Sequence, residues 1–300
     1  MSRTSWDTSR IPDLTGKTAI VTGATIGLET ARALAQKNAS IRLAVRNTDK
    51  GEAVAQDIRA TAPDADVRVR RLDLADLSSV KAFADETLAS EERLDFLINN
   101  AGVMMPPPGK TKDGFDLQFG TNHLWHFALV GQLLPLLEST PGARIVNVAS
   151  LAHRYGKLDF NDLNWESRDF NTQRAYSDSK IANLHFTYEL ARRLKSASKD
   201  IRVTAAHPGW TSTDLQRHSG LFQFLNPFFA QQPPQGALPT LRAACDDSAQ
   251  SGDYFGPKGF MEMRGAPVQV KSSERSHDDK AAAQLWSVSE TMTGVSYLSA

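Results

Sequence analysis

A tyrosine and a lysine four residues apart, Tyr176 and Lys180, are the residues of this sequence best suited to proton transfer. On a helix, residues at this spacing share one face. A lysine ammonium beside a phenol favours the phenolate and would bring the pKa of the tyrosine down from about 10 toward neutrality. Such a tyrosine can protonate the alkoxide that forms when a hydride adds to a carbonyl. The same spacing also occurs on amphipathic surface helices, so the pair needs support from other residues.

Short apolar runs alternate with helical patterns from residue 17 to about residue 210. The predicted strands are 18–21, 41–45, 67–72, 96–98, 144–148 and 201–205. The predicted helices start at 28 and span about 49–61, 78–90, 121–137 and 176–196. This alternation indicates an α/β fold with a mainly parallel sheet and helices on both faces. We therefore predict one doubly wound, Rossmann-type domain over 16–300, after an N-terminal extension at 1–15 and with a last strand and tail at 268–300.

The segment 214–236 interrupts this pattern with six large apolar residues and three prolines. We predict that it covers a substrate pocket. The alternative is a surface helix packed on the sheet.

A glycine-containing turn follows the first predicted strand and reads Thr-Gly-Ala-Thr-Ile-Gly-Leu-Glu over residues 22–29. Such a turn brings backbone N–H groups onto a pyrophosphate, and the start of the next helix adds positive potential. Two glycines alone are a weak signal, but their place after the first strand strengthens it. The sequence predicts dinucleotide contacts at Gly23, Thr25, Ile26 and Gly27.

Two cations, Arg46 and Lys50, follow the second predicted strand. A carboxylate there would bind the ribose 2′-hydroxyl, whereas arginine favours a 2′-phosphate. Cations near a helix start are mildly disfavoured by the helix dipole, so a binding role explains them better than a solvated surface does. We predict NADP(H) as the cofactor, with NAD(H) as the alternative because Asp49 lies between the two cations.

Further motifs occur along the chain in the order typical of one enzyme family. After the glycine turn these motifs are Asp73 and Leu74, Asn99–Gly102, Asn122, Ser150, Tyr176–Lys180, and Pro208 and Gly209. In this order the sequence resembles the short-chain dehydrogenase/reductase family over about residues 16 to 300. The stretches 119–123, 150–153, 159–165 and 285–289 resemble its retinol-dehydrogenase and protochlorophyllide-reductase-like branch in particular.

The resemblance implies an NADP(H)-dependent oxidoreductase acting on an apolar ketone, aldehyde or alcohol. Its catalytic residues would be Asn122, Ser150, Tyr176 and Lys180. In this reading Ser150 hydrogen-bonds the substrate oxygen, Lys180 also holds the nicotinamide ribose, and Asn122 anchors a water for proton relay. Members of the family are often dimers or tetramers, so a homo-oligomer is implied by analogy.

The resemblance also implies further cofactor contacts. Beside the adenine it places Asp73 and Leu74. Along the ribose it places Asn99, Ala101 and Gly102. Around the nicotinamide and the phosphates it places Pro208, Gly209, Thr211 and Thr213.

The sequence departs from the family at two positions. The turn usually carries three glycines, and here Glu29 stands at the third place. An alignment with a gap keeps the next helix in register and leaves two residues, one of them a glycine, missing before Ile26. At the second position Trp125 replaces a common glycine, and we expect it to fill space in the core.

Composition excludes several other classes of protein. The 34 Lys and Arg residues balance the 34 Asp and Glu residues, so the basic excess of a nucleic-acid binder is missing. Cys245 is the only cysteine, and the seven histidines form no metal-ligand pattern, so we predict no metal. The start of the chain lacks the apolar core of a signal peptide, and no run reaches the length of a membrane span. We therefore expect a cytoplasmic protein, and attachment to a membrane surface is the alternative.

Two other functions remain open. The shortened turn would suit a scaffold or regulatory protein that resembles a dehydrogenase but has lost cofactor binding. An NAD-dependent epimerase would also use Tyr and Lys four residues apart, but it usually has a larger C-terminal domain than this chain could form.

Overall fold

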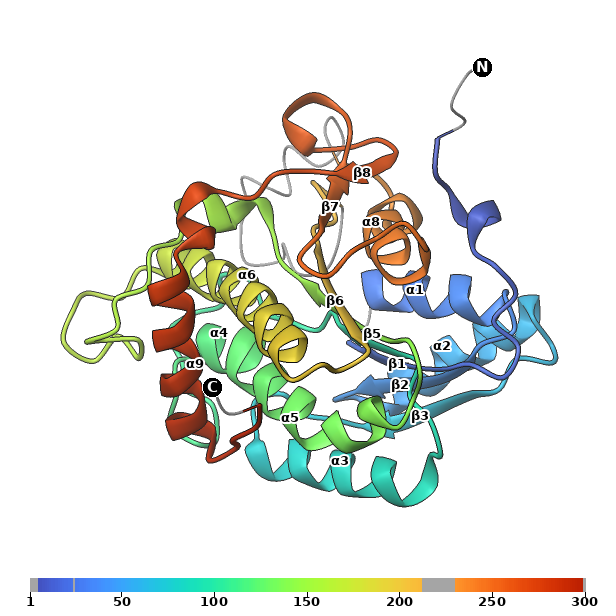
Figure 1. The fold of residues 1–300 in the computed structure, drawn as a ribbon, viewed down its shortest axis with the longest axis horizontal. Coiled ribbons are helices and arrows are strands. Elements are labelled where there is room, and N and C mark those ends of the chain that lie inside the picture. Colours follow the sequence, from blue (N-terminus) through green and yellow to red (C-terminus); the bar gives the residue numbers. More distant parts are fainter. Residues whose placement is uncertain (1–4, 24, 212–229, 299–300) are drawn as a thin grey trace.

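The computed structural model describes residues 5–23, 25–211 and 230–298 and shows one eight-stranded sheet (Figure 1). The strand order is β3-β2-β1-β4-β5-β6-β7-β8, with β1 to β7 parallel and β8 antiparallel to β7. The strands are β1 (Thr18–Thr22), β2 (Ser40–Val45), β3 (Val67–Arg71), β4 (Phe96–Asn99), β5 (Ala143–Val148), β6 (Ile201–Ala206), β7 (Tyr254–Pro257) and β8 (Pro267–Gln269). The predicted doubly wound α/β fold is confirmed.

Helices cover both faces of the sheet, as predicted (Figure 1). One face carries α3 (Leu77–Ser90), α5 (Trp125–Glu138), α6 (Thr172–Ser196) and α9 (Asp279–Thr293). The other face carries α1 (Ile26–Ala35), α2 (Thr48–Thr61) and α8 (Pro233–Cys245). Each layer has its own apolar cluster, and the central strands are buried on both sides, as expected for a parallel sheet.

Two predicted helices begin elsewhere than expected. The helix predicted from residue 121 is α5, which starts only at Trp125. It follows the short helix α4 (Leu117–Phe119) and one wide π-turn, η2 (Gly120–Leu124). The helix predicted from Tyr176 is α6, which starts four residues earlier because the Asn171 side chain caps it by accepting from the backbone N–H of Arg174.

The C-terminal part contains more regular structure than predicted. The last predicted strand is present as β8, but β7 and the helices α8 and α9 were missed. Of the segment predicted to cover a pocket, 214–229 lies outside the described residues, and 233–236 forms the first turn of α8.

The residues before 16, predicted as an extension, lie against the domain from residue 5 onward. Trp6, Ile11 and Leu14 are at most 6% exposed and belong to the same apolar cluster as α1. The backbone N–H of Leu14 also donates to the carbonyl of Lys37. In the described part, this stretch therefore contributes to the core.

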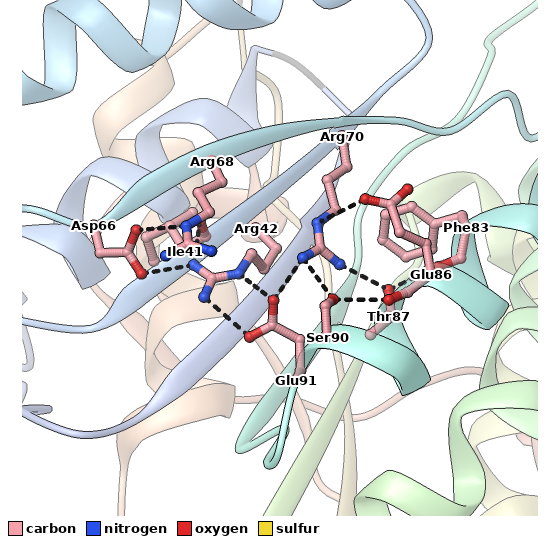
Figure 2. A network of polar contacts seen from close by, with 10 residues as sticks. All are labelled: Ile41, Arg42, Asp66, Arg68, Arg70, Phe83, Glu86, Thr87, Ser90 and Glu91. Carbon is pink, nitrogen blue, oxygen red and sulfur yellow. Dashed lines mark hydrogen bonds and ion pairs between the residues drawn. The ribbon is translucent and has the colours of Figure 1, made fainter.

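A buried ion network joins β2 and β3 to the end of α3 (Figure 2). The guanidinium of Arg42 donates to both oxygens of Glu91, at 2.6 and 3.0 Å, and Arg70 donates to the same carboxylate at 2.7 Å. These three side chains are only 6–8% exposed. Arg42 also pairs with Asp66 at 2.9 Å. Glu91 thus pairs with both buried arginines, while Asp66 adds a second carboxylate to Arg42 and Glu86 a second one to Arg70.

Replacing Glu91 with glutamine is expected to lower the free energy of unfolding by about 1.5–3 kcal/mol. The amide keeps the shape of the side chain but removes the charge and turns one acceptor into a donor that faces Arg42. Urea denaturation monitored by circular dichroism measures the change. Glu52→Gln is the control, since Glu52 is exposed and lies 3.9 Å from its partner Arg59. Equal midpoints for the two variants would show that the network does not stabilise the fold.

Candidate functional site

A cleft of about 550 Å³ lies at the carboxyl ends of the parallel strands. From β1 the chain adds β2 and β3 on one side and then β4 and the later strands on the other. The cleft opens at this change of direction, which is the usual ligand site of such sheets. Of the predicted site residues, the cleft is lined by Gly23, Thr25, Ile26, Arg46, Lys50, Asp73, Leu74, Ala101, Gly102, Tyr176, Lys180 and Pro208. The structure therefore brings residues from six separate motifs into one cavity.

The glycine turn packs closely against the segment after β4. Gly23 has a φ of +83°, and a Cβ there would lie 2.8 Å from the Cα of Ala101. A Cβ on Gly27 would lie 2.5 Å from the side-chain nitrogen of Asn100. Only glycine fits these two positions, because one needs a left-handed backbone and both need close approach. Gly27 therefore supports the turn from outside the cleft.

Thr25, between these glycines, has an unusual backbone conformation. Its φ is +71° and its ψ is −102°, a region that costs a residue other than glycine of order 1–3 kcal/mol. Thr25 is also the residue before α1, and its side chain makes no capping hydrogen bond. A glycine would adopt this conformation without strain, which supports the alignment in which the turn has lost a glycine.

Asn100 lines the cleft, although the sequence pointed to Asn99. Asn100 donates from its side chain to the carbonyl of Thr22 at 2.9 Å, and its backbone N–H donates to the Thr22 hydroxyl at 3.0 Å. Asn99 lies behind the cleft and donates to Asn147 at 2.9 Å. Successive side chains at a strand end point in opposite directions, so a one-residue difference in register decides which asparagine faces the cavity.

Arg46 and Lys50 stand together at the end of the cleft formed by β2 and α2. The backbone N–H of Lys50 donates to the Asn47 side chain, which caps α2. Among the described residues, neither cationic side chain has an ion-pair partner. Asp73 lines the same cavity and accepts from the backbone N–H of Ala75 at 3.0 Å. This end of the cleft thus offers two uncommitted cations to an anionic group.

Tyr176 and Lys180 lie at the other end of the cleft, on α6. The ammonium of Lys180 is 5.7 Å from the centre of the Tyr176 ring and donates to the carbonyl of Val148 at 3.1 Å. Ser150, just after β5, is hydrogen-bonded to Tyr176, and its hydroxyl also accepts from the backbone N–H of Ala152. The predicted serine, tyrosine and lysine are therefore close together.

The predicted direction of the pKa shift of Tyr176 is wrong for this structure. Burial raises the pKa of Tyr176 to about 12, and the hydrogen bond from Ser150 offsets only part of that effect. Burial also lowers the pKa of Lys180 to about 8, because the charged form is costly away from water. At neutral pH these shifts leave Tyr176 neutral and Lys180 charged.

Asn122 lies in the π-turn behind the cleft and holds the segment after β4. Its side chain accepts from the backbone N–H of Val103 at 2.8 Å and donates to the Val103 carbonyl at 3.0 Å. It also donates to the Ser179 hydroxyl at 2.9 Å. A Cβ on Gly102 would lie 2.8 Å from the Asn122 oxygen, so the two residues are in contact. These contacts make Asn122 a support for the cleft wall.

Trp125, which directly follows the π-turn, is fully buried. Its ring meets that of Phe115 edge-on, with the centres 5.6 Å apart. The side chain belongs to the core cluster between α5 and the sheet, as predicted from its size.

The segment after β6 contributes Pro208 to the cleft, whereas Gly209 and Thr211 lie beside it. The Thr211 hydroxyl donates to the carbonyl of Pro208 at 2.8 Å. Thr213 lies outside the described residues.

Apolar residues that the sequence did not single out line the cleft between the cofactor motifs and α6. They are Val103, Met104, Pro106 and Leu117. The carbonyl of Pro106 accepts from the Thr172 hydroxyl at 3.0 Å. Thr172 is the first residue of α6 and lies one helical turn before Tyr176, so this contact joins the apolar wall to the start of α6. The only sequence signal for Val103, Met104 and Pro106 was the apolar run after the Asn99–Gly102 motif, and Leu117 had none.

Across 5–23, 25–211 and 230–298, no cluster of three or more His, Cys, Asp and Glu side chains could hold a metal ion. No helix within these ranges is both long enough and apolar enough to span a bilayer.

Known proteins resemble this chain over most of its length. Residues 17–222 match the short chain dehydrogenase family. Human retinol dehydrogenase 13 is 43% identical over 293 residues, which are 93% of this chain and 85% of that protein. Human retinol dehydrogenase 11 is 43% identical over 94% of this chain and 87% of its own length. The crystal structure of an uncharacterized protein from Mycobacterium paratuberculosis has a TM-score of 0.84 and 40% identity, covering 98% of this chain and 99% of that one. This chain belongs to the short-chain dehydrogenase/reductase family, in its retinol-dehydrogenase-like branch.

Proposed function

We propose that this protein is an NADP(H)-dependent oxidoreductase that transfers a hydride between the nicotinamide and the carbonyl or alcohol group of an apolar small molecule. The observation that carries the proposal is the single cleft that runs from Arg46 and Lys50 to Tyr176 and Lys180. A dinucleotide with a 2′-phosphate needs cations at one end and reactive groups at the other. The apolar wall formed by Val103 and its neighbours supports an apolar substrate.

The residues fit the cofactor at each part of the cleft. Arg46 and Lys50 would hold the 2′-phosphate, and the turn after β1 would hold the pyrophosphate through its backbone N–H groups. A Cβ on Gly102 would lie 3.6 Å from the Lys180 ammonium, so glycine keeps the space beside that ammonium free of a side chain. When bound, the nicotinamide supplies or accepts the hydride.

The protein's own part in the reaction is to position the substrate oxygen and move one proton. In the reductive direction Ser150 donates a hydrogen bond to the substrate oxygen. The neutral phenol of Tyr176 then gives its proton to the alkoxide oxygen as the C–H bond forms. Lys180 remains charged near neutral pH and stabilises the phenolate left behind, since a nearby cation favours that form. Oxidation of an alcohol uses the same groups in reverse.

Replacing Arg46 with aspartate is expected to weaken NADPH binding by about 10- to 150-fold, the value of one charge-assisted hydrogen bond. Binding of NADH should change less or improve, because a carboxylate can accept from a ribose 2′-hydroxyl. Calorimetry with each cofactor gives the two affinities. Lys280→Asp is the control, since it makes the same charge change on the exposed start of α9. Equal or better use of NADH by the unaltered protein would contradict the NADP(H) assignment.

The substrate class needs a separate test. The relatives are named for retinol, so a panel of apolar alcohols and carbonyls should include retinol and retinal beside short aliphatic compounds. Absorbance of the reduced nicotinamide with each cofactor follows turnover.

The strained, short turn at Thr25 favours a second candidate function. A protein that had lost cofactor binding could act as a scaffold or regulatory binder. The fluorescence of added NADPH separates the two functions, because a shift and an enhancement indicate binding.

A further inference from the structure

The carboxylate of Glu262 lies between two segments of the proposed active site. It accepts from Nε2 of His207 at 2.9 Å and from Arg154 at 2.7 Å. His207 directly precedes Pro208, which lines the cleft. Arg154 lies in the short 3-10 helix η3 (Leu151–Tyr155), whose first turn is capped by Ser150. One side chain therefore connects the segment after β5 with the segment after β6.

The turn that carries Glu262 is held in a costly conformation. Met261 and Glu262 have φ values of +50° and +57° within the short helix η5 (Phe260–Glu262). Each costs of order 1–3 kcal/mol for a residue other than glycine. The side chains of Phe260 and Met261 are 80% and 61% exposed, so burial of these residues does not compensate the strain. This conformation brings the carboxylate of Glu262 into contact with His207 and Arg154.

The contacts of His207 fix which of its nitrogens carries the proton. The backbone N–H of Gly209 donates to Nδ1 at 3.2 Å, so Nδ1 is unprotonated. The proton is then on Nε2, where it points at Glu262. His207 is fully buried, and burial holds its pKa below the usual range, so the ring is neutral. A carboxylate acceptor on Nε2 selects this tautomer.

The surroundings leave the His207 ring and the Gly209 backbone little room to move. A Cβ on Gly256 would lie 2.0 Å from Nε2 of His207. A Cβ on Gly209, whose φ is +66°, would lie 2.4 Å from the carbonyl of Met263. The same carbonyl accepts from the backbone N–H of Trp210. The orientation of the segment after β6 is thus tied to the turn around Glu262.

The segment after β5 is tied down by a second histidine. Nδ1 of His153 lies 2.6 Å from the carbonyl of Ser150, and its Nε2 accepts from the backbone N–H of Ser273. His153 therefore donates from Nδ1 to Ser150, and the adjacent Arg154 extends outward to Glu262. The segment after β5 is thus held by His153 at the Ser150 carbonyl and by Glu262 at Arg154.

We propose that Glu262 is a positioning residue, which orients Pro208 and Gly209 toward the cofactor through the His207 tautomer and steadies the Ser150 segment through Arg154. This inference rests on the proposed function for its effect on cofactor and substrate, while the tautomer itself is a property of the protein alone.

Three variants separate the two contacts. Glu262→Ala removes both and is expected to weaken NADPH binding and lower kcat by about tenfold or more, the range seen when an outer residue that orients a ligand is lost. Glu262→Gln keeps an oxygen that accepts from Nε2, so NADPH affinity should stay close to that of the unaltered protein. Arg154→Met removes only the other contact, so kcat should fall while NADPH affinity is retained. Glu274→Ala, an exposed glutamate in the nearby helix η6 (Glu274–His277), is the matched control.

The measurements are calorimetry with NADPH, steady-state kinetics, the thermal midpoint and nitrogen-15 NMR of labelled histidines. The NMR spectrum reports which ring nitrogen of His207 is protonated, and it should change in Glu262→Ala but not in Glu262→Gln. The proposal is overturned if Glu262→Ala keeps the tautomer, or if only its thermal midpoint falls while affinity and kcat are unchanged. Equal defects in Glu262→Ala and Glu262→Gln would also overturn it. If the unaltered protein binds no NADPH, the proposed function fails, and the NMR comparison still decides the role of Glu262 toward His207.

Discussion

Replacing Tyr176 with phenylalanine is expected to lower kcat by about 100- to 10,000-fold, the usual contribution of a general acid. The change removes only the hydroxyl that protonates the substrate oxygen. The ring on α6 stays in its buried position, so the fold and the affinity for NADPH should be nearly unaltered. Steady-state rates with the best substrate of the panel, together with calorimetry, measure both effects.

Tyr155→Phe is the control for this change. Tyr155 lies only a few residues after Ser150, but its side chain is 76% exposed, so loss of its hydroxyl should leave the rate unchanged. Lys180→Ala should lower both the rate and the NADPH affinity, because Lys180 would serve Tyr176 and the ribose. Ordinary activity in Tyr176→Phe would remove the basis of the whole catalytic assignment.

Lengthening the turn after β1 is expected to tighten NADPH binding by about 10- to 10,000-fold. The variant inserts one residue after Ala24 and a glycine after Thr25. A turn that is two residues longer would give the pyrophosphate one or two more backbone N–H donors, each worth about 1.5–3 kcal/mol toward a charged group. Each 1.4 kcal/mol is a factor of ten in affinity. Calorimetry on both proteins gives the ratio.

Thr25→Gly tests the effect of the backbone strain at residue 25 separately from the effect of the number of backbone N–H donors in the turn. It relieves the positive φ at that residue and should raise the free energy of unfolding by of order 1 kcal/mol, while adding no N–H group to the turn. Its NADPH affinity should therefore stay near that of the unaltered protein. If the insertion leaves affinity unchanged or weakens it, the alignment with a gap is wrong and the short turn is already competent.

The positions of the central strands along the chain could be predicted from the sequence, because each strand is a short apolar run between helical patterns. The misses have local causes. The helix α8 begins with Pro233 and Pro234. The sequence pattern assigns both prolines to the segment predicted to cover a pocket, but proline is well accommodated in the first turn of a helix. The π-turn before Trp125 adds one residue to a single helical turn. The spacing of apolar residues in the sequence is too coarse to reveal one extra residue.

The site could be predicted where its residues stand at the ends of strands. Parallel strands present their carboxyl ends at one edge of the sheet, so Gly23, Arg46 and Ala101 had to lie near one another. The pKa of Tyr176 could not be predicted, because it depends mainly on the burial of the phenol, which the spacing of Tyr176 and Lys180 does not reveal. Glu262 could not be found either. Its partners are 55 and 108 residues away in the chain, and no motif connects them.

The strand order also determines how the sheet meets other chains. An open sheet ends in two strands with unpaired backbone groups, which can recruit a strand from a neighbouring molecule and start aggregation. Here those strands are β3 and β8. β3 carries the exposed charges of Arg68 and Arg71, and β8 has only three residues and begins with Pro267, which has no N–H to donate. Both borders are therefore poor templates for β-sheet growth, so the protein should tolerate high concentration without forming fibrils.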